Sequence, residues 1–534
     1  MGSNPNCVVD LAATAAKYSV RPAISEGKNN ICYGEFVRKV SRLAAELHPL
    51  IRSGRIGILG SRSATAYIGI AAAAWAGAAY VPLNLKWPAE RLIRLMRELE
   101  LDAIIVDDNG ERCLTAEVVA HAPKTIYFAR DVARIGAVDQ PDRMVLAEPV
   151  RRAETDTAYI VFTSGTTGEP KGVVVSCGSL KRYLDNTETW TELNPDDRIA
   201  EAHDVTFDLS VHNMFLAWRA GASLHLMSAL DMMAPQAFIR GRSITCWMSV
   251  PTIVNNMRRN GALRPDVFPS LRLSIFCGEP LAMTTVSDWA KAAPNSVIEN
   301  IYGPTECTVV CTRQRLTRPP VVTPERQILS IGEPYENFDV IIRGSGGDPL
   351  GDNLVGEITI ASEQLSDGYF NRPEQTAEKF RVIDGRRWYF TGDLGYRDPD
   401  GRYHHMGRAD NQIKLKGNRV ELEEVDMHLR KACGTDLACV VAWPTVEGSV
   451  QGLVGYSTNT ALTERQVRSA MMKSIPEYMV PARIIIRENL PRNANDKIDR
   501  NALVAELDRE AGDATIASPP IAPELDADRV KTTA

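Results

Sequence analysis

The sequence predicts an α/β fold, with a large N-terminal domain of doubly wound sheets plus a β-rich subdomain, and a small mobile α+β C-terminal domain. Three observations predict it. Helix-like and strand-like segments alternate over 10–150, short strands dominate from about 355, and a compact α/β stretch follows Asp410. Alternating β and α segments are typical of a mainly parallel, doubly wound sheet. The 534 residues also exceed what one core supports, so roughly two to four domains are expected.

The N-terminal elements follow from hydrophobic periodicity. Residues 33–47 have apolar side chains at helical spacing, and 55–60 form a short apolar strand that ends in glycine. Residues 89–99 predict an amphipathic helix, and 102–108 predict the strand after it. These segments give the β and α alternation on which the fold class rests.

Later segments define the expected domain limits. The strand pattern returns over 243–251 and 271–279, and from about 355 short strands with Gly-Asp turns are expected. The chain end is rich in Pro, Ala and Asp and has no apolar period, which is typical of disorder. We therefore expect an N-terminal core over 1–409, a C-terminal domain over 410–505 and a disordered tail over 506–534.

Composition excludes several classes of protein. The net charge of -6 argues against a nucleic-acid binder, which usually has a basic surface. The apolar run 68–85 is rich in Ala and Gly and contains Pro82, so it predicts a buried helix and strand and no membrane span. No signal peptide is recognised at the start. The 10 cysteines contain no CxxC pair, which favours reduced thiols in a cytoplasmic protein over a zinc site.

A loop rich in glycine and hydroxyl groups, TSGTTGEPKG at 163–172, lies between two β-prone runs. Glycines let backbone N–H groups turn inward, hydroxyls donate hydrogen bonds and Lys171 adds a positive charge, which together can hold phosphate oxygens. The spacing is not that of the GxxxxGK[ST] phosphate loop. From composition alone, a flexible surface loop explains the run equally well.

The order TSGTTGxPKG resembles the adenylate-forming superfamily, which includes acyl-CoA synthetases, luciferases and the adenylation domains of nonribosomal peptide synthetases. Further segments resemble family motifs in the same order over about 31–505: WAGAAYVPLN (75–84), TFDLS (206–210), NIYGPTE (300–306), YFTGDL (389–394), GRADNQIKLKGNRVELEEVD (407–426) and PRNANDKIDR (491–500). Through FDLSV and IFCGE, the chain is most similar to stand-alone amino-acid activators such as the D-alanine–carrier protein ligases.

The resemblance implies sites for ATP and Mg²⁺. Tyr302 is expected to stack on adenine, Asn300 to contact its edge, Asp393 to accept the ribose hydroxyls and Arg408 to contact ribose or phosphate. Further nucleotide-binding residues implied by the motifs are Thr163, Ser164, Gly165, Thr166, Thr167, Gly168, Lys171, Gly278, Glu279 and Gly303.

The resemblance also implies the catalytic residues. Lys497 is expected to bridge the substrate carboxylate and the α-phosphate, although outside this motif it would be an ordinary surface lysine. Thr305 and Glu306 are implied beside it, with Glu306 as the Mg²⁺ ligand. Asp410 corresponds to the hinge about which the small domain rotates. The family usually has Gly where this chain has Asp496, and often Arg where it has Lys416.

Asp208 indicates which acid is activated. In the amino-acid branch it pairs with the substrate α-ammonium group, whereas a helix N-cap is the ordinary alternative. The other implied pocket residues are Leu209, His212, Met248, Ile275, Cys277, Ile301, Val309 and Val310. They are mostly apolar and none is an acid, Lys or Arg, so a small neutral amino acid is predicted: alanine first, then serine, glycine or proline. His212 could bond a hydroxyl, although a structural role is favoured slightly.

The predicted function is that of a discrete enzyme that loads an amino acid onto the phosphopantetheine thiol of a separate carrier protein, because no carrier segment is recognised after residue 505. The alternatives are an acyl- or aryl-CoA ligase, against which Asp208 argues, and an amide-bond-forming enzyme. An adenylate-binding scaffold without activity is a further alternative, against which Lys497, Glu306 and Asp393 argue.

Overall fold

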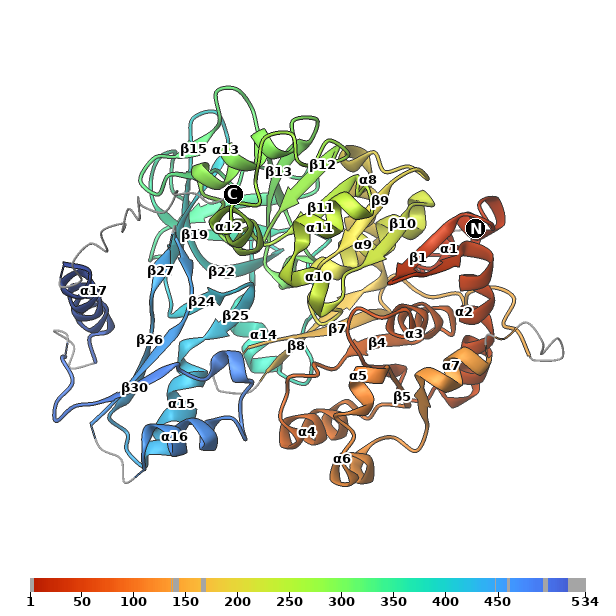
Figure 1. Ribbon diagram of the computed structural model, residues 1–534, viewed down its shortest axis with the longest axis horizontal. Helices are drawn as coiled ribbons and strands as arrows, with labels where there is room; N and C mark the ends of the chain where they lie inside the picture. The colour runs from red at the N-terminus through yellow and green to blue at the C-terminus, as the bar shows by residue number, and fades with distance from the viewer. Residues whose placement is uncertain are drawn as a thin grey trace, which may run out of the picture.

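The computed structural model describes residues 4–135, 137, 144–164, 170–446, 448–458, 462–492 and 498–516. Two large sheets form the N-terminal part (Figure 1). The first runs in the order β17 (Glu333–Pro334), β14 (Thr312–Arg315), β13 (Val297–Tyr302), β12 (Leu273–Phe276), β11 (Cys246–Ser249), β9 (Arg198–Glu201), β10 (Ser223–Leu226), β1 (Pro22–Glu26), β2 (Asn29–Cys32). The second runs β20 (Gly368–Tyr369), β8 (Lys171–Ser176), β7 (Thr157–Thr163), β4 (Ala79–Pro82), β3 (Arg55–Leu59), β5 (Ala103–Val106), β6 (Ile126–Phe128).

Parallel pairing dominates the centre of both sheets. In the first sheet β11, β12 and β13 pair in parallel, and in the second β3 pairs in parallel with β4 and β5. Helices α2 (Tyr33–Leu47), α3 (Ala64–Trp75), α8 (Cys177–Thr191) and α9 (Leu209–Ala220) contribute side chains to one large hydrophobic core with these sheets. Parallel strands bring their carboxyl ends to one edge, where ligands of such sheets bind.

The expected N-terminal elements are confirmed. Residues 33–47 form α2, 55–59 form β3, 89–99 form α4 (Ala89–Leu99) and 103–106 form β5. The run 68–85 contributes to α3, which is almost entirely buried, and to β4. Among the residues described above, no helix has both the length and the apolar character that a membrane crossing requires.

The β-rich subdomain differs from expectation in one detail. Its sheet runs β18 (Asp339–Arg343), β19 (Gly356–Ala361), β22 (Arg386–Arg397), β21 (Phe380–Ile383), with β23 (Tyr403–Arg408) also paired to β22. Turns with Gly and Asp flank β22 as expected, but this strand is longer than the short strands expected, because YFTGDL lies inside its 12 residues. Gly392 has a φ of 75°, and the register shifts after Leu394, so glycine lets the strand bend without ending it.

The smaller C-terminal domain has its own sheets and its own core. One sheet runs β25 (Asn418–Glu421), β24 (Gln412–Leu415), β28 (Ser449–Val450), β27 (Thr445–Val446), and the other runs β26 (Ala438–Ala442), β29 (Leu453–Ser457), β30 (Arg483–Ile486). Helix α15 (Leu422–Cys433) packs on these sheets and against α16 (Glu464–Met471), with Val420, Val425 and Leu429 fully buried. Figure 1 shows this domain beside the N-terminal part, with β24 and β25 nearest to it.

The expectation of a disordered tail from residue 506 is wrong over 506–516. Helix α17 (Arg500–Ile516) extends into the range for which disorder was predicted, so 506–516 is helical. Leu503 and Leu507, one turn apart, are buried against Cys439, Val441 and Tyr456. Two leucines were too short a pattern to detect as a helix from sequence. Residues 517–534 lie outside the described residues.

Candidate functional site

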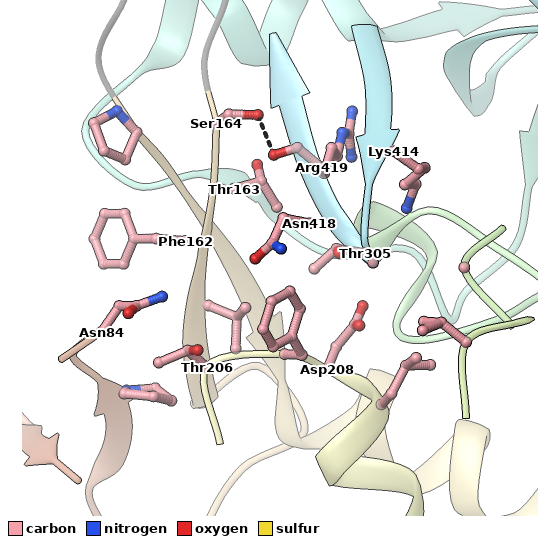
Figure 2. A pocket seen from close by; sticks show the side chains of 18 of the residues that line it. Asn84, Phe162, Thr163, Ser164, Thr206, Asp208, Thr305, Lys414, Asn418 and Arg419 are labelled. Atoms are coloured by element: carbon pink, nitrogen blue, oxygen red, sulfur yellow. Dashed lines mark hydrogen bonds between the residues drawn. The ribbon is translucent and has the colours of Figure 1, made fainter. Parts of the chain in front are cut away.

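The candidate site lies where the loops after β7, β12 and β13 meet the hairpin β24–β25 (Figure 2). A cavity of about 90 Å³ lies among them and is lined by residues that include Thr163, Ser164, Asp208, Cys277, Thr305 and Lys414. A second cavity of about 340 Å³ adjoins it and shares Gly278, Gly303, Lys414 and Arg419 with the first. The two cavities bring together motifs that are far apart in the sequence.

The second cavity contains the residues expected to bind the nucleotide. Tyr302, Asn300, Asp393 and Arg408 line it, together with Ile301. The Tyr302 hydroxyl donates to Asp393 Oδ2 at 2.6 Å, and Arg408 Nη1 donates to Asp393 Oδ1 at 2.7 Å. Burial alone would raise the pKa of Asp393, but Arg408, His405 and Tyr302 lower it well below its usual range. Asp393 is therefore an ionised acceptor on the cavity wall.

Asn300 differs partly from its expected role. Its amide nitrogen donates to the carbonyl oxygen of Ser330 at 2.8 Å, so this group anchors a neighbouring loop. The residue still lines the cavity, and its side-chain oxygen is the atom that remains to contact an adenine edge.

Glu306 is buried and makes two short contacts. The Tyr369 hydroxyl donates to Oε1 at 2.8 Å, and Arg419 Nη1 donates to Oε2 at 2.8 Å. Burial alone would raise the pKa of Glu306, but Arg419 and Tyr369 lower it to about 2. The described residues contain no group of three or more His, Cys, Asp or Glu side chains that could together hold a metal ion. A single ionised carboxylate fits Mg²⁺, which binds one or two carboxylates plus substrate phosphates.

The hydroxyl-rich loop is the connection of a β-hairpin, since Thr163 pairs with Lys171 across β7 and β8. The Ser164 hydroxyl donates to the carbonyl oxygen of Arg419 at 2.8 Å. Lys171 is buried and its ammonium nitrogen lies 5.3 Å from the centroid of the Tyr369 ring. The predictions for Gly165, Thr166, Thr167 and Gly168 fall outside the described residues, as does the prediction for Lys497.

The Asp208 side chain points into the first cavity, towards Thr305 (Figure 2). It occupies the N-cap position of α9, but its side chain makes no capping hydrogen bond. Burial raises the pKa of Asp208, whereas the Thr305 hydroxyl and the charge of Lys414 oppose this rise. A half-buried carboxylate that faces the cavity and does not cap its helix is available for a cation there.

The other expected pocket residues are all buried but do not share one cavity. Leu209, Cys277 and Val309 line the cavity that contains Asp208. His212, Met248 and Ile275 surround a separate cavity of only about 10 Å³. Val310 packs beside Gly303, where an added Cβ would come within 2.3 Å of the Val310 Cα.

His212 has a structural partner. Its Nδ1 atom and the Tyr183 hydroxyl are joined by a hydrogen bond of 2.6 Å. Burial lowers the pKa of His212 to about 3, so the ring is neutral at pH 7. This pairing supports the structural interpretation of His212.

Glu279 and Asp410 link the two domains. Glu279 Oε2 accepts from Thr252, and its Oε1 accepts from the backbone N–H of Gly417 at 2.8 Å. Asp410 accepts two hydrogen bonds from Arg408, at 2.6 and 2.7 Å. Asp410 therefore contacts the same arginine that holds Asp393.

A family model described as AMP-binding enzyme matches residues 11–370. The chain belongs to this family. The D-alanine–D-alanyl carrier protein ligase of Bacillus velezensis is 28% identical over 492 residues, covering 90% of this chain and 95% of that protein. Tyrocidine synthase 2 of Brevibacillus parabrevis is 32% identical over 481 residues, covering 87% of this chain and only 13% of that longer protein.

Solved structures agree with the family assignment. The Vibrio cholerae adenylation domain AlmE, in complex with glycyl-adenosine-5'-phosphate, superimposes with a TM-score of 0.84 at 28% identity, covering 95% of this chain and 99% of that chain. IdnL7 superimposes with a TM-score of 0.69 at 30% identity, covering 95% of this chain and all of that chain. This AMP-binding enzyme is an adenylate-forming, ATP-dependent ligase with the fold of an adenylation domain.

Several residues at the candidate site of this AMP-binding enzyme were not predicted from the sequence. His405 lies on the wall of the nucleotide cavity, with Nε2 3.5 Å from Asp393 Oδ1 and with Arg326 Nη1 2.8 Å from its Nδ1. Arg419, which pairs with Glu306, and Gln364, which contacts the loop after β13, were also not predicted from the sequence. The pairing of Asp393 with Arg408 in the β22–β23 ladder, which brings His405 close, could not be read from the sequence.

Proposed function

We propose that this enzyme activates a small neutral amino acid with ATP and transfers it to the phosphopantetheine thiol of a separate carrier protein. The observation that carries the proposal is the half-buried Asp208 carboxylate, which faces the cavity and does not cap its helix. An α-ammonium group supplies the charge that such a carboxylate requires, whereas an acid without the amine would leave it without this partner.

The second cavity is the proposed nucleotide site. Asp393 accepts the ribose hydroxyls, Tyr302 lies against the base, and Arg408 contacts ribose or phosphate. Glu306 would hold Mg²⁺, which supplies charge neutralisation at the phosphates when bound. Lys171 and the loop 163–172 bind the pyrophosphate portion, and Lys497 brings its charge to the reacting carboxylate and α-phosphate.

The substrate is small because apolar side chains close the cavity. Cys277, Leu209 and Val309 are 3%, 8% and 1% exposed and contain no charged group. Alanine is the first choice, followed by serine, glycine or proline. The names of the carrier protein ligase and of the glycyl-adenylate complex support a small amino acid.

A larger cavity of about 920 Å³ supports transfer to a carrier. Its lining includes Thr206, Phe207 and Leu209 beside the amino-acid cavity, and Lys416 and Gly417 at the tip of the hairpin β24–β25. A long thiol arm from a separate protein can reach the reacting carbonyl along this route. We propose that the small domain begins at residue 410 and that Asp410 is its hinge. We also propose the cytoplasm as its location, because all ten cysteines are free thiols.

The test is amino-acid-dependent exchange of pyrophosphate into ATP, followed by loading of a phosphopantetheine-bearing carrier protein. Exchange with alanine and transfer to the carrier would support the proposal. Exchange only with acids that lack an α-amine would favour an acyl- or aryl-CoA ligase. Exchange with amino acids, followed by release to free amines and not to thiols, would favour an amide-bond-forming enzyme.

A further inference from the structure

The loop after β13 contains a strained turn. Thr308 and Val309 are consecutive residues with positive φ, at 61° and 73°. Both are β-branched, and a positive φ is a genuine outlier for such residues. Strain of this kind persists only where the surrounding structure enforces it, and it occurs preferentially at functional sites.

Gln364 enforces this turn. Its amide nitrogen lies 3.1, 3.2 and 3.1 Å from the carbonyl oxygens of Cys307, Thr308 and Val310. The Thr308 hydroxyl donates to the carbonyl oxygen of Gln364 at 2.7 Å. Gln364 is fully buried, so water does not compete for these hydrogen bonds.

The turn supplies one wall of the amino-acid cavity. Val309 lines the cavity that contains Asp208 and Cys277, whereas Gln364 does not border it. The same loop carries Thr305 and Glu306, and the backbone N–H of Ser366 donates to the carbonyl oxygen of Glu306 at 2.8 Å. The segment that contains Gln364 therefore holds this loop at more than one point.

We propose that Gln364 is a positioning residue that fixes the Val309 wall and thereby sets the size limit for the substrate side chain. It acts through backbone carbonyls and does not touch the substrate. The inference rests on the proposed function, because it assigns the Val309 wall to an amino-acid site. It assigns Gln364 a role at that site and gives a structural cause for the limit on the size of the substrate side chain.

Two variants test whether the Gln364 amide holds the turn at Thr308 and Val309. Gln364→Glu keeps the shape but replaces the donating amide with a carboxylate, and Gln364→Met removes the donor altogether. Gln466→Glu is the matched control, because Gln466 belongs to the capping box of α16, where a glutamate serves equally well. Kinetics of pyrophosphate exchange are measured for glycine, alanine, serine and valine, with KM for ATP determined separately.

We expect KM for alanine to rise and the preference for alanine over valine to fall by about tenfold in both variants, with KM for ATP unchanged. The control should retain the preference of the wild type. A parallel loss for alanine, valine and ATP would indicate a merely structural role and would overturn the proposal. So would an unchanged preference for alanine.

Hydrogen exchange separates failure of this inference from failure of the proposed function. The backbone N–H groups of Cys307, Thr308, Val310 and Cys311 are hydrogen-bonded within the loop. In the ligand-free protein, Gln364→Glu should speed their exchange and leave α9 protected. An unchanged rate of hydrogen exchange at these amides would show that Gln364 does not hold the turn, whatever acid the enzyme activates. If either variant fails to fold, the other supplies both measurements.

Discussion

Arg419 Nη1 lies 2.8 Å from Glu306 Oε2, and this ion pair joins the small domain to the candidate metal ligand. Glu306 is only 1% exposed and its other oxygen accepts from Tyr369. The carbonyl oxygen of Arg419 also accepts from Ser164 in the loop expected to hold phosphates. The hairpin β24–β25 thus contacts both Glu306 and Ser164, so a Mg²⁺ ion held by Glu306, as we propose, would compete with Arg419 in this domain orientation.

Arg419→Met should therefore ease metal binding. Without the guanidinium group, a cation at Glu306 no longer has to displace a bound partner. We expect the Mg²⁺ concentration for half-maximal pyrophosphate exchange to fall several-fold. Arg419→Lys, which retains a positive charge, should lie between the wild type and Arg419→Met. An unchanged Mg²⁺ requirement in both variants would contradict competition between Arg419 and Mg²⁺ for the Glu306 carboxylate.

The same pair predicts a pH dependence of stability. A carboxyl group whose pKa falls from 4.5 to about 2 on folding contributes about 3 kcal/mol. The folded pKa is depressed, so this contribution is complete above pH 4.5 and is lost as the pH falls towards 2. We expect the difference in unfolding free energy between wild type and Glu306→Gln to shrink over that interval. Denaturant titrations at several pH values measure it, and a difference that does not change with pH would refute the assignment.

Asp208→Asn should impair amino-acid recognition selectively. The amide cannot form a charge-assisted bond with an ammonium group, which is worth about 1.5–3 kcal/mol. KM for the amino acid should rise by about 10- to 100-fold, with little change in KM for ATP. Asp231→Asn is the control, because Asp231 belongs to an exposed capping box on helix α10 (Ala229–Met233). Equal increases in KM for both substrates would count against the ammonium assignment.

A buried ion pair between the domains should favour one orientation. Arg91 on α4 contacts Glu424 on α15, and the two side chains are 4% and 0% exposed. If the small domain rotates about Asp410, as we propose, the rotation separates these two side chains and leaves each charge without its partner. We expect Arg91→Met to slow transfer of the aminoacyl group from preformed adenylate more than it slows pyrophosphate exchange. Exchanging the two residues, in the double variant Arg91→Glu and Glu424→Arg, should restore transfer.

The ion pair of Arg372 and Glu98 is the matched comparison. Glu98 also lies on α4, but its partner Arg372 belongs to the N-terminal part, so the pair does not cross the hinge. Arg372→Met should affect transfer and exchange equally little. If Arg91→Met slows both half-reactions to the same extent, the ion pair does not distinguish the orientations.

Local sequence patterns predicted the elements that carry strong periodicity. Helices α2 and α4 and strands β3 and β5 are where the apolar spacing placed them, because each buries one face in the core. The resemblance to family motifs also predicted that Asp208, Tyr302, Thr305 and Asp393 serve one site. In the structure these residues line two adjoining cavities. These residues follow strands or helices whose order along the chain could be recognised.

Contacts between distant segments could not be predicted in the same way. Arg419 contacts Glu306 only because the hairpin β24–β25 packs against the loop after β13. Gln364 contacts the turn at Val309 from the segment between β19 and β20, which is distant in sequence. Neither side chain belongs to a short pattern with a known partner. The bend at Gly392 and the helix beyond Leu507 were missed for a related reason, since tertiary packing decides both.

The central claim is that Asp208 selects a small amino acid for adenylation. We would first measure ATP–pyrophosphate exchange across the proteinogenic amino acids, both alanine enantiomers and several fatty and aryl acids. We expect a maximum at alanine or another small neutral amino acid, with little exchange for acids that lack the amine. Exchange confined to acids without an α-amine would contradict it and would move the enzyme to the acyl-CoA ligases.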